Sequence, residues 1–256
     1  HRNAYCVKRL RIMLFSSISF LYYFLPLTLV LYFAVPKAFK NTVLLLASLL
    51  FYGWGEPKYV ILMALSILLG YGFGLLVEKY REKRSGKAIC ELSVGISLAF
   101  LVYFKYADFF IQNVNAVTGL QLSLLRLALP IGISFYTFQM ISYTVDVYKG
   151  ERAQRNLIHL ATYIAMFPQL IAGPIVRYAD IAGQLADRKC TWQKSAWGIR
   201  RFVIGLAKKI LIANQLGELC SAFRASQEKS VLFCWMYAIA FTLQIYFDFS
   251  GYSDMA

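Results

Sequence analysis

The stretch NTVLLLASLLFYGWGEPKYVILMALSILLGYGFGLLV, residues 41–77, decides the fold class. Its two apolar blocks, residues 41–55 and 59–77, contain no Lys, Arg, Asp or Glu, and Glu56 and Lys58 lie in the short link between them. Helices of about this length, at 1.5 Å per residue, cross a hydrocarbon core of about 30 Å. Because lipid offers the backbone no hydrogen bonds, helix is the expected conformation of both blocks.

Similar blocks recur along the whole chain. Of its 256 residues, 59% are hydrophobic and 16% are charged, which is far from the balance of a soluble domain. The composition therefore predicts an all-α polytopic integral membrane protein with about six transmembrane helices plus re-entrant and interfacial helices. The further blocks without charged residues are residues 13–36, 127–145, 156–176 and 230–247, and residues 92–104, directly after Glu91, form a shorter one.

The formal net charge of +14 has an explanation other than nucleic-acid binding. The cations lie in the short links between apolar blocks, where they indicate topology and contacts with anionic lipids. No basic stripe with stacking aromatic residues exists apart from this pattern, so we expect no nucleic acid among the partners. The five cysteines are scattered without a C-x-x-C spacing, which supports neither a disulfide framework nor a zinc site.

The densest group of basic residues, in the loop at residues 79–87, predicts the orientation of the chain in the membrane. By the positive-inside rule this loop is cytoplasmic, which places the link at residues 55–58 outside and a second basic link, residues 149–155, inside again. Three expected spans precede the loop, so the N-terminus would be outside. The cations of the loop are Lys79, Arg81, Lys83, Arg84 and Lys87.

Residues 156–176 conflict with a simple crossing. A full span would place the basic run that starts at Arg177 outside, and Pro168 and the Gly173-Pro174 pair interrupt the helix. Broken helix at membrane depth is tolerated where it is buried in protein or lines a cavity. We therefore expect a re-entrant segment with both ends cytoplasmic; a full span with a weak charge rule is the alternative.

Residues 197–216 predict an interfacial helix. At 100° per residue, Arg200, Arg201, Lys208 and Lys209 fall on one side of this helix and apolar residues on the other. This pattern favours a helix on the cytoplasmic surface over a span.

Both ends of the chain raise expectations. Residues 1–12 are basic and precede Met13, and we interpret them as a doubtful leader from an extended gene model, a signal-peptide n-region being the alternative. The chain stops soon after Tyr252 without a polar tail. We therefore expect residues 13–256 to be the N-terminal part of a longer membrane domain.

Polar side chains within spans are costly in lipid, so function is sought there first. In PIGISFYTFQMISYTVDVYKGE, residues 130–151, Gln139, Tyr143 and Asp146 share one helical face. They could line a path for a headgroup or a carbonyl, or simply hydrogen-bond between helices, with Asp146 reaching the interface.

Two further polar clusters follow. In MFPQLIAGPIVRY, residues 166–178, Gln169 and Arg177 flank a broken helix that lines a pathway or is a plain kink. In LQIYFDFSGYSDMA, residues 243–256, two carboxylates could form an acid/base pair, or Ser253 or Asp254 could cap a following helix. The candidate lining residues of this third cluster are Gln244, Asp248, Ser250, Tyr252 and Asp254.

Common catalytic motifs are missing. No P-loop, dinucleotide glycine fingerprint, G-x-S-x-G elbow or H-E-x-x-H occurs. His159 stands alone in an apolar segment, which is typical of a hydrogen-bonded interior residue rather than a catalyst, and we expect no metal site.

Five motifs along the chain, and their order, resemble the membrane-bound O-acyltransferase family. The resemblance is to its bacterial branch, which includes the alginate O-acetyltransferase membrane subunit. The five motifs are MLFSSISFLYYFLPLTLVLYF, SLLFYGWGEPKY, PIGISFYTFQMISYTVDVYKG, FPQLIAGPIVRY and QIYFDFSGYSDMA. The resemblance implies a polytopic helical protein whose central tunnel hands an acyl group from a cytoplasmic donor to an exported polysaccharide.

The resemblance also implies where catalysis occurs. The family's histidine, in a Trp-His context, follows the FDFSGYSDMA segment and would lie after Ala256, and His159 does not match its motif. We therefore expect no catalytic residue in this chain and no activity of the fragment by itself.

The leading hypothesis is a bacterial inner-membrane O-acyltransferase subunit that acetylates alginate or another cell-surface polymer. Its donor, acetyl-CoA or an acyl carrier, would be a substrate and not a bound cofactor. Its partners would be the lipid bilayer, the polysaccharide acceptor and a periplasmic or extracellular acyltransferase. A non-catalytic membrane transporter or scaffold for an acyl carrier is the alternative.

Overall fold

The computed structural model describes residues 15–170, 173, 176–186, 188, 190–226 and 230–256, so the predictions on residues 1–12 and on Pro174 lie outside the described residues. Throughout these ranges the regular elements are helices and no strand occurs. The fold class predicted from the apolar blocks is therefore confirmed. The chain divides into two compact units, and α2, Leu25–Ala34, crosses the division between them.

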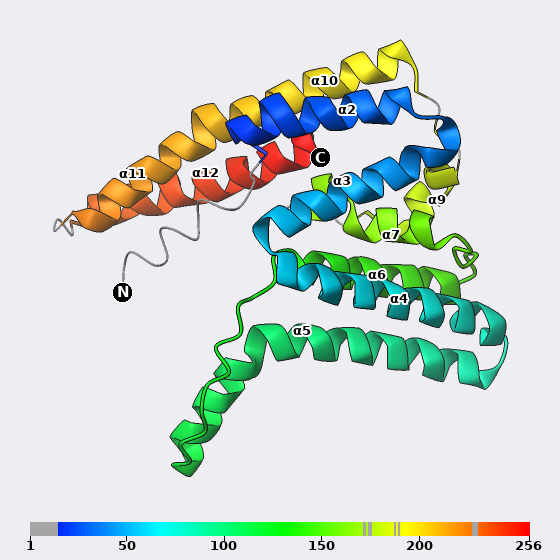
Figure 1. The fold of residues 1–256 in the computed structure, drawn as a ribbon. Coiled ribbons are helices and arrows are strands. Elements are labelled where there is room, and N and C mark those ends of the chain that lie inside the picture. The colour runs from blue at the N-terminus through cyan, green and yellow to red at the C-terminus, as the bar shows by residue number, and fades with distance from the viewer. Residues whose placement is uncertain (1–14, 171–172, 174–175, 187, 189, 227–229) are drawn as a thin grey trace. The chain divides into compact units, whose positions relative to one another are not determined.

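The first unit is a bundle of helices from residue 30 to residue 188. Successive helices of this unit lie side by side in Figure 1, with α4 between α3 and α5 and with α6 packed on both α4 and α5. Its elements are η2 (Lys37–Phe39), α3 (Lys40–Gly55), α4 (Pro57–Tyr80), α5 (Arg84–Thr118), α6 (Ile133–Tyr148), α7 (Leu157–Ala165), α8 (Phe167–Leu170) and α9 (Tyr178–Ala186).

The core of this unit is apolar and aromatic. Met63, Val77, Tyr143, Leu160 and Ile164 are completely buried within it. Most other large apolar side chains of the long helices are exposed, as a lipid-facing surface requires. The helices thus bury few side chains against one another and present the rest outward.

The expected spans form helices of two kinds, long ones that could cross a membrane alone and shorter ones of 16 residues. Three helices of the described residues are long and apolar enough to cross a membrane alone: Pro57–Tyr80, Arg84–Thr118 and Val231–Met255. The helices α3 and α6 have 16 residues each, about 24 Å at 1.5 Å per residue. The number of six spans stays a prediction.

The block at residues 127–145 is only partly helical, which corrects the expectation of a continuous helix. The chain leaves α5 at Gly119 and becomes helical again at Ile133. Pro130 lacks an amide proton, and Gly132 has a left-handed φ of 71°, so neither suits an α-helical interior. Figure 1 shows this non-helical segment running back along the projecting end of α5.

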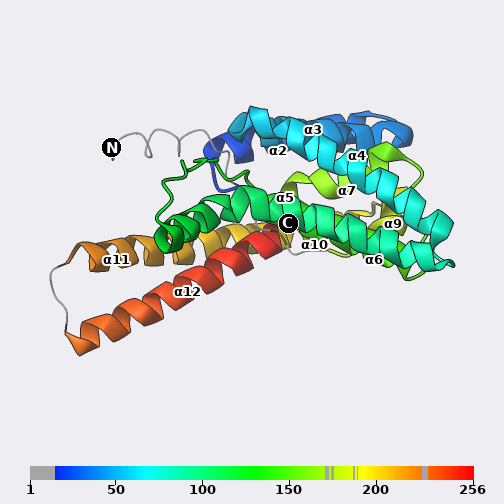
Figure 2. The ribbon, with the colours of Figure 1, turned by 90° about the horizontal axis from the view of Figure 1, so that it is seen from below.

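The second unit contains a long helical rod next to α12, as Figures 1 and 2 both show. The rod is continuous from Trp192 to Ala225 and changes to π-helical winding in its middle. Its elements are α10 (Trp192–Ala207), η3 (Lys208–Ala213) and α11 (Asn214–Ala225); α12 (Val231–Met255) and the π-helical η1 (Ser19–Phe24) complete the unit.

The rod contains the helix predicted at residues 197–216, whose location at the membrane surface stays a prediction. Lys208 and Lys209, expected to face the cytosol, form ion pairs with α12, and their side chains are only 29% and 13% exposed. Arg200 and Arg201 are exposed, as are the apolar residues Ile199, Val203 and Leu211. The four cations therefore do not share one exposed side of the rod, because the two lysines face α12.

The α10 and α12 backbones come very close at Gly205 and Gly251. A Cβ atom added to Gly205 would lie 2.6 Å from the Gly251 carbonyl oxygen, and one added to Gly251 would lie 2.9 Å from the Gly205 carbonyl oxygen. Small residues permit such crossings in membrane helices, where close backbone packing is a main source of association. This crossing brings the lysines at the start of η3 next to the last turns of α12.

Candidate functional site

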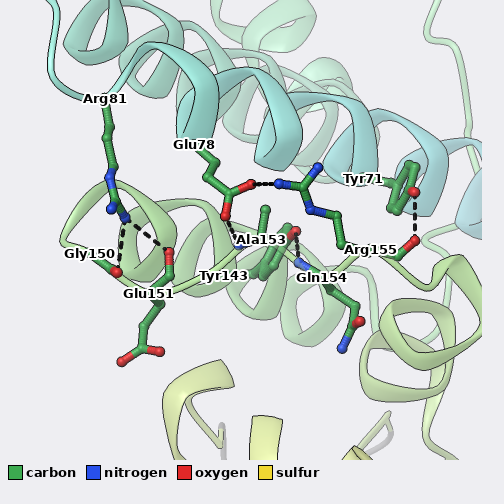
Figure 3. A network of polar contacts seen from close by, with 9 residues as sticks. All are labelled: Tyr71, Glu78, Arg81, Tyr143, Gly150, Glu151, Ala153, Gln154 and Arg155. Carbon is green, nitrogen blue, oxygen red and sulfur yellow. Dashed lines mark hydrogen bonds and ion pairs between the residues drawn. The ribbon is translucent and has the colours of Figure 1, made fainter.

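The link between α6 and α7 meets the turn between α4 and α5 at one end of the first unit, which we call the basic end (Figure 3). Arg81 donates to the Gly150 carbonyl at 3.0 Å, and Glu78 pairs with Arg155 at 2.6 Å. The two basic links that the positive-inside rule assigns to one side of the membrane therefore lie together.

Side chains hold the backbone of this link at nearly every residue (Figure 3). Glu78 accepts from the Ala153 amide at 3.1 Å, Tyr143 accepts from the Gln154 amide at 3.1 Å, and Tyr71 donates to the Arg155 carbonyl at 2.9 Å. An irregular segment whose polar backbone groups are paired in this way has one defined conformation. The link thus fixes the start of the broken segment that follows it.

The broken segment turns back to the basic end. The link directly before it is held there by Tyr143. At its far end, Tyr163 donates to the Val176 carbonyl at 2.9 Å, and Arg177 pairs with Asp146 in the last turn of α6 at 2.8 Å. In between, α7 ends at Met166, whose ψ of 113° is not helical. Both ends of the segment therefore lie at the same end of α6, which agrees with the re-entrant interpretation, and its path relative to the membrane stays a prediction.

The tip of the segment, α8, reaches the opposite end of α6. The Leu170 carbonyl lies against Gly132, directly before the first turn of α6. Ser48 on α3 accepts from the Phe167 amide at 3.2 Å, and the Gln139 amide donates to the Gln169 side-chain oxygen at 3.0 Å. The tip is therefore held from both sides by polar groups in the bundle interior.

Gln139, Tyr143 and Asp146 all face the re-entrant segment, as their spacing predicts. Each of the three side chains is at most 2% exposed. Gln139 contacts Gln169, the Tyr143 ring packs on the Tyr178 ring at 4.9 Å, and Asp146 binds Arg177. The structure thus unites the first two predicted clusters in one polar seam, defined as Gln139, Tyr143, Asp146, Gln169 and Arg177.

The Asp146–Arg177 pair is asymmetric. The Asp146 side chain is 2% exposed, whereas that of Arg177 is 60% exposed. The hydrogen bond to Asp146 raises the pKa of the Arg177 guanidinium. A buried carboxylate depends strongly on its counter-ion, because burial without one is costly.

We expect Arg177→Gln to destabilise the protein more than Asp146→Asn, since only the first leaves a buried charge without its partner. The double variant should melt close to Asp146→Asn. Thermal melting of detergent-solubilised protein, followed by tryptophan fluorescence, measures all three. Exposed Arg152 gives the matched control Arg152→Gln, which should leave Tm unchanged. Equal effects of the two single variants would contradict this account of the pair.

The third cluster lies in the second unit and consists of ion pairs between the rod and α12. Lys209 binds Asp248, and Asp254 accepts from Arg201 at 3.0 Å and from Lys208 at 2.5 Å. The two carboxylates, six residues apart on one helix, differ by about 9 Å along its axis and have different cations. An acid/base pair is therefore not what this geometry favours.

The remaining predicted residues of this cluster pack around the same crossing. Ser250 accepts from Lys208 at 3.0 Å, and the Tyr252 ring contacts Phe15 at 5.6 Å and Lys209 at 5.1 Å. The Gln244 side chain lies next to Gly217, and its oxygen is buried without a partner among the described residues. Ser253 and Asp254 lie inside α12, which corrects their expected role as caps of a following helix.

Sequence reasoning missed several residues of these sites. Lys208 and Lys209 were predicted to face away from the protein, whereas they pair with Asp254 and Asp248 of α12. Glu78 could not be recognised from the sequence, because its partners Ala153 and Arg155 are 75 and 77 residues away. His159 lies partly buried on α7.

The chemistry open to the described residues is limited by these pairs. Asp146, Asp248 and Asp254 are each already engaged in an ion pair with a cation. Within the described ranges, no three His, Cys, Asp or Glu side chains gather as metal ligands. Gln139, Tyr143 and Gln169 of the seam offer neutral hydrogen-bonding groups in the bundle interior instead.

Comparison with known proteins gives a consistent result. The model of the MBOAT, membrane-bound O-acyltransferase, family matches residues 118–256. The chain is 43% identical over 251 residues to the "Probable alginate O-acetylase" of Pseudomonas putida. The matched region covers 95% of this chain and 52% of that protein.

More distant relatives have related names. The chain is 32% identical over 284 residues to a peptidoglycan O-acetyltransferase of Helicobacter pylori, covering 98% of this chain and 54% of the relative. It is 26% identical over 211 residues to a teichoic acid D-alanyltransferase of Lacticaseibacillus rhamnosus, covering 74% and 49%. The chain spans about half the length of these curated relatives. No solved structure matches it.

Proposed function

Since this chain belongs to the membrane-bound O-acyltransferase family, we propose that it forms part of an enzyme that transfers acetyl groups to hydroxyls of an exported polysaccharide. Alginate is the acceptor that the names of several relatives indicate, and peptidoglycan is another. The donor would be acetyl-CoA or an acyl carrier, and the enzyme would work in the bacterial inner membrane with a periplasmic or extracellular acyltransferase partner.

The observation that carries this proposal is the polar seam along the re-entrant segment. It begins at the basic end with the Asp146–Arg177 pair and reaches the opposite end of α6 through Tyr143, Gln139 and Gln169. Polar groups in the interior of a membrane bundle are costly and mark pathways. A seam of this extent suits a protein that passes a polar acyl group from one side of the membrane to the other.

Acyl transfer to a hydroxyl forms an ester bond and breaks the bond between the acyl carbon and the donor's thiol. One group must accept the hydroxyl proton while the oxygen attacks, and the departing thiolate takes up a proton. A neutral imidazole is the usual base at neutral pH. The three aspartates of the described sites are paired with cations and do not suit this task. In this proposal a histidine in a Trp-His motif, encoded after Ala256, accepts the proton.

The native gene on both sides of this segment provides the first test. An open reading frame that continues through a Trp-His motif supports the enzyme, and a stop codon directly after Ala256 favours the transporter or scaffold. The native-length product, expressed in a host that lacks its own polysaccharide acetylation, should then restore acetyl groups on the polymer.

Within that product we expect Gln139→Leu to reduce acetylation by roughly tenfold or more, the loss that corresponds to about 1.4 kcal/mol of transition-state stabilisation. Acetyl content is measured by NMR of the isolated polymer, with protein amount as normalisation. Gln184, exposed on α9, gives the matched control Gln184→Leu. Full acetylation by the Gln139→Leu or Asp248→Asn variant would remove that residue from the proposed lining.

A further inference from the structure

Three polar atoms on α3 and α6 are buried and have no hydrogen-bond partner among the described residues. They are the hydroxyls of Tyr52 and Tyr136 and the side-chain carbonyl of Gln139. The three side chains are only 4%, 2% and 2% exposed. Buried polar groups are nearly always hydrogen-bonded, and exceptions point to a bound water or ligand.

The three groups come from two helices that flank the tip of the re-entrant segment. Tyr52 follows Phe51 on α3, and the Phe51 ring packs on Phe167 of α8 at 5.6 Å. Tyr136 and Gln139 lie one turn apart on α6, where Gln139 binds Gln169 of α8. Glu56, one turn after Tyr52, accepts from the Ile131 amide directly before α6, which brings together the ends of α3 and α6 that carry the two phenols.

We propose that Tyr52, Tyr136 and Gln139 form a hydroxyl-binding pocket at the tip of the re-entrant segment. Each phenol both donates and accepts a hydrogen bond, and the amide carbonyl accepts one. None of the three is charged, so the pocket suits a neutral hydroxyl rather than an anion or a metal ion. Glu56, the nearby carboxylate, already accepts from the Ile131 amide at 3.2 Å.

The hydroxyl has two possible sources. An internal water would complete the hydrogen bonds of the bundle, and a sugar hydroxyl of the acceptor would make the pocket part of the substrate path. The second source rests on the proposed function, and the first does not. Neither source changes the chemistry that the three groups recognise.

Tyr52→Phe and Tyr136→Phe test the pocket, because phenylalanine keeps the ring and removes only the hydroxyl. The Tyr136 ring, which also lines a narrow cleft between α4, α5 and α6, therefore keeps its packing. A hydroxyl that binds nothing gives a phenylalanine variant of equal or higher stability. A hydroxyl that binds a water or a ligand gives a Tm lower by about 2–4 °C per variant.

Two matched variants calibrate this measurement. Tyr163→Phe removes a hydroxyl with a known bond to the Val176 carbonyl and should lower Tm by a similar amount. Tyr22→Phe removes a hydroxyl from a side chain that is 73% exposed and should leave Tm unchanged. All variants are made in the native-length protein and melted in the same detergent.

The sources are separated by adding a mannuronate trisaccharide. A Tm increase in the parent protein that is lost in Tyr136→Phe identifies a sugar hydroxyl, and destabilised variants without any saccharide effect identify water. Phenylalanine variants at least as stable as the parent, with no saccharide effect, overturn the pocket.

Radiolytic footprinting of the unaltered protein covers the case in which a variant fails to fold. Bound hydroxyls near buried Tyr52 and Tyr136 should lead to modification of both rings, whereas Tyr163 serves as the buried reference. Unmodified Tyr52 and Tyr136, together with no saccharide effect, overturn the proposal. These readouts do not use acetylation, so they fail independently of the proposed function.

Discussion

Replacing Gly205 or Gly251 with valine is expected to separate α10 from α12 and to cause the largest loss of stability among single substitutions in the second unit. The new side chain would meet a backbone carbonyl oxygen of the facing helix, which cannot move out of the way as a side chain can. Overpacking typically costs about 1–3 kcal/mol, and a backbone obstacle places this case at or above the upper value. Separation would also pull Lys208 and Lys209 away from their aspartates.

Melting and size-exclusion chromatography of the detergent-solubilised variants measure this loss. Gly198, on the same helix, has no atom within 4 Å of its added Cβ, so Gly198→Val is the matched control. It carries the same change in helix propensity without the collision. A Gly205→Val variant that melts with Gly198→Val would show that the two backbones do not meet.

Replacing Gly132 with alanine is expected to displace the tip of the re-entrant segment. Gly132 has a φ of 71°, a left-handed conformation that costs other L-residues about 1–2 kcal/mol. Its added Cβ would also collide with the Leu170 carbonyl oxygen. The hydrogen bond between Gln139 and Gln169 lies close to this point and should weaken with it.

A substitution at Gly119 separates the two causes of destabilisation, the backbone strain and the collision with Leu170. Its φ of 72° matches that of Gly132, but no atom lies within 4 Å of its added Cβ. Gly119→Ala therefore reports the backbone strain alone, and the additional loss in Gly132→Ala reports the collision. Thermal melting gives both values, and equal losses in the two variants would contradict a tight contact between α6 and the tip.

The helices could be predicted from the sequence because their cause is local. Long blocks without charges must be helical in lipid, and Gln139, Tyr143 and Asp146 share a face wherever an uninterrupted helix contains them. The re-entrant turn could also be predicted, since Pro168 and a conflict with the charge rule both point to it. The predicted start of α6 was wrong by several residues, because hydropathy does not account for the missing amide proton of Pro130 or the left-handed φ of Gly132.

The partners of the charged residues could not be predicted, because they lie far apart in sequence. Lys208 and Lys209 bind residues 46 and 39 positions away. A helical projection shows only that the cations share a side, and it does not reveal whether water or another helix faces that side. The π-helical winding of η3 also shifts the phase on which such a projection depends.

The tightly held link at residues 150–155 has a practical meaning for topology mapping. By composition it resembles an exposed polar loop of the kind usually chosen for epitope or reporter insertion. Its amides and carbonyls, however, are bound by Glu78, Arg81, Tyr71 and Tyr143. Tolerance of an insertion depends on the backbone bonds that it breaks rather than on position in a loop. A tag inserted here would break the hydrogen bonds that hold the start of the re-entrant segment. The result would describe a damaged protein instead of the side of the membrane on which the loop lies.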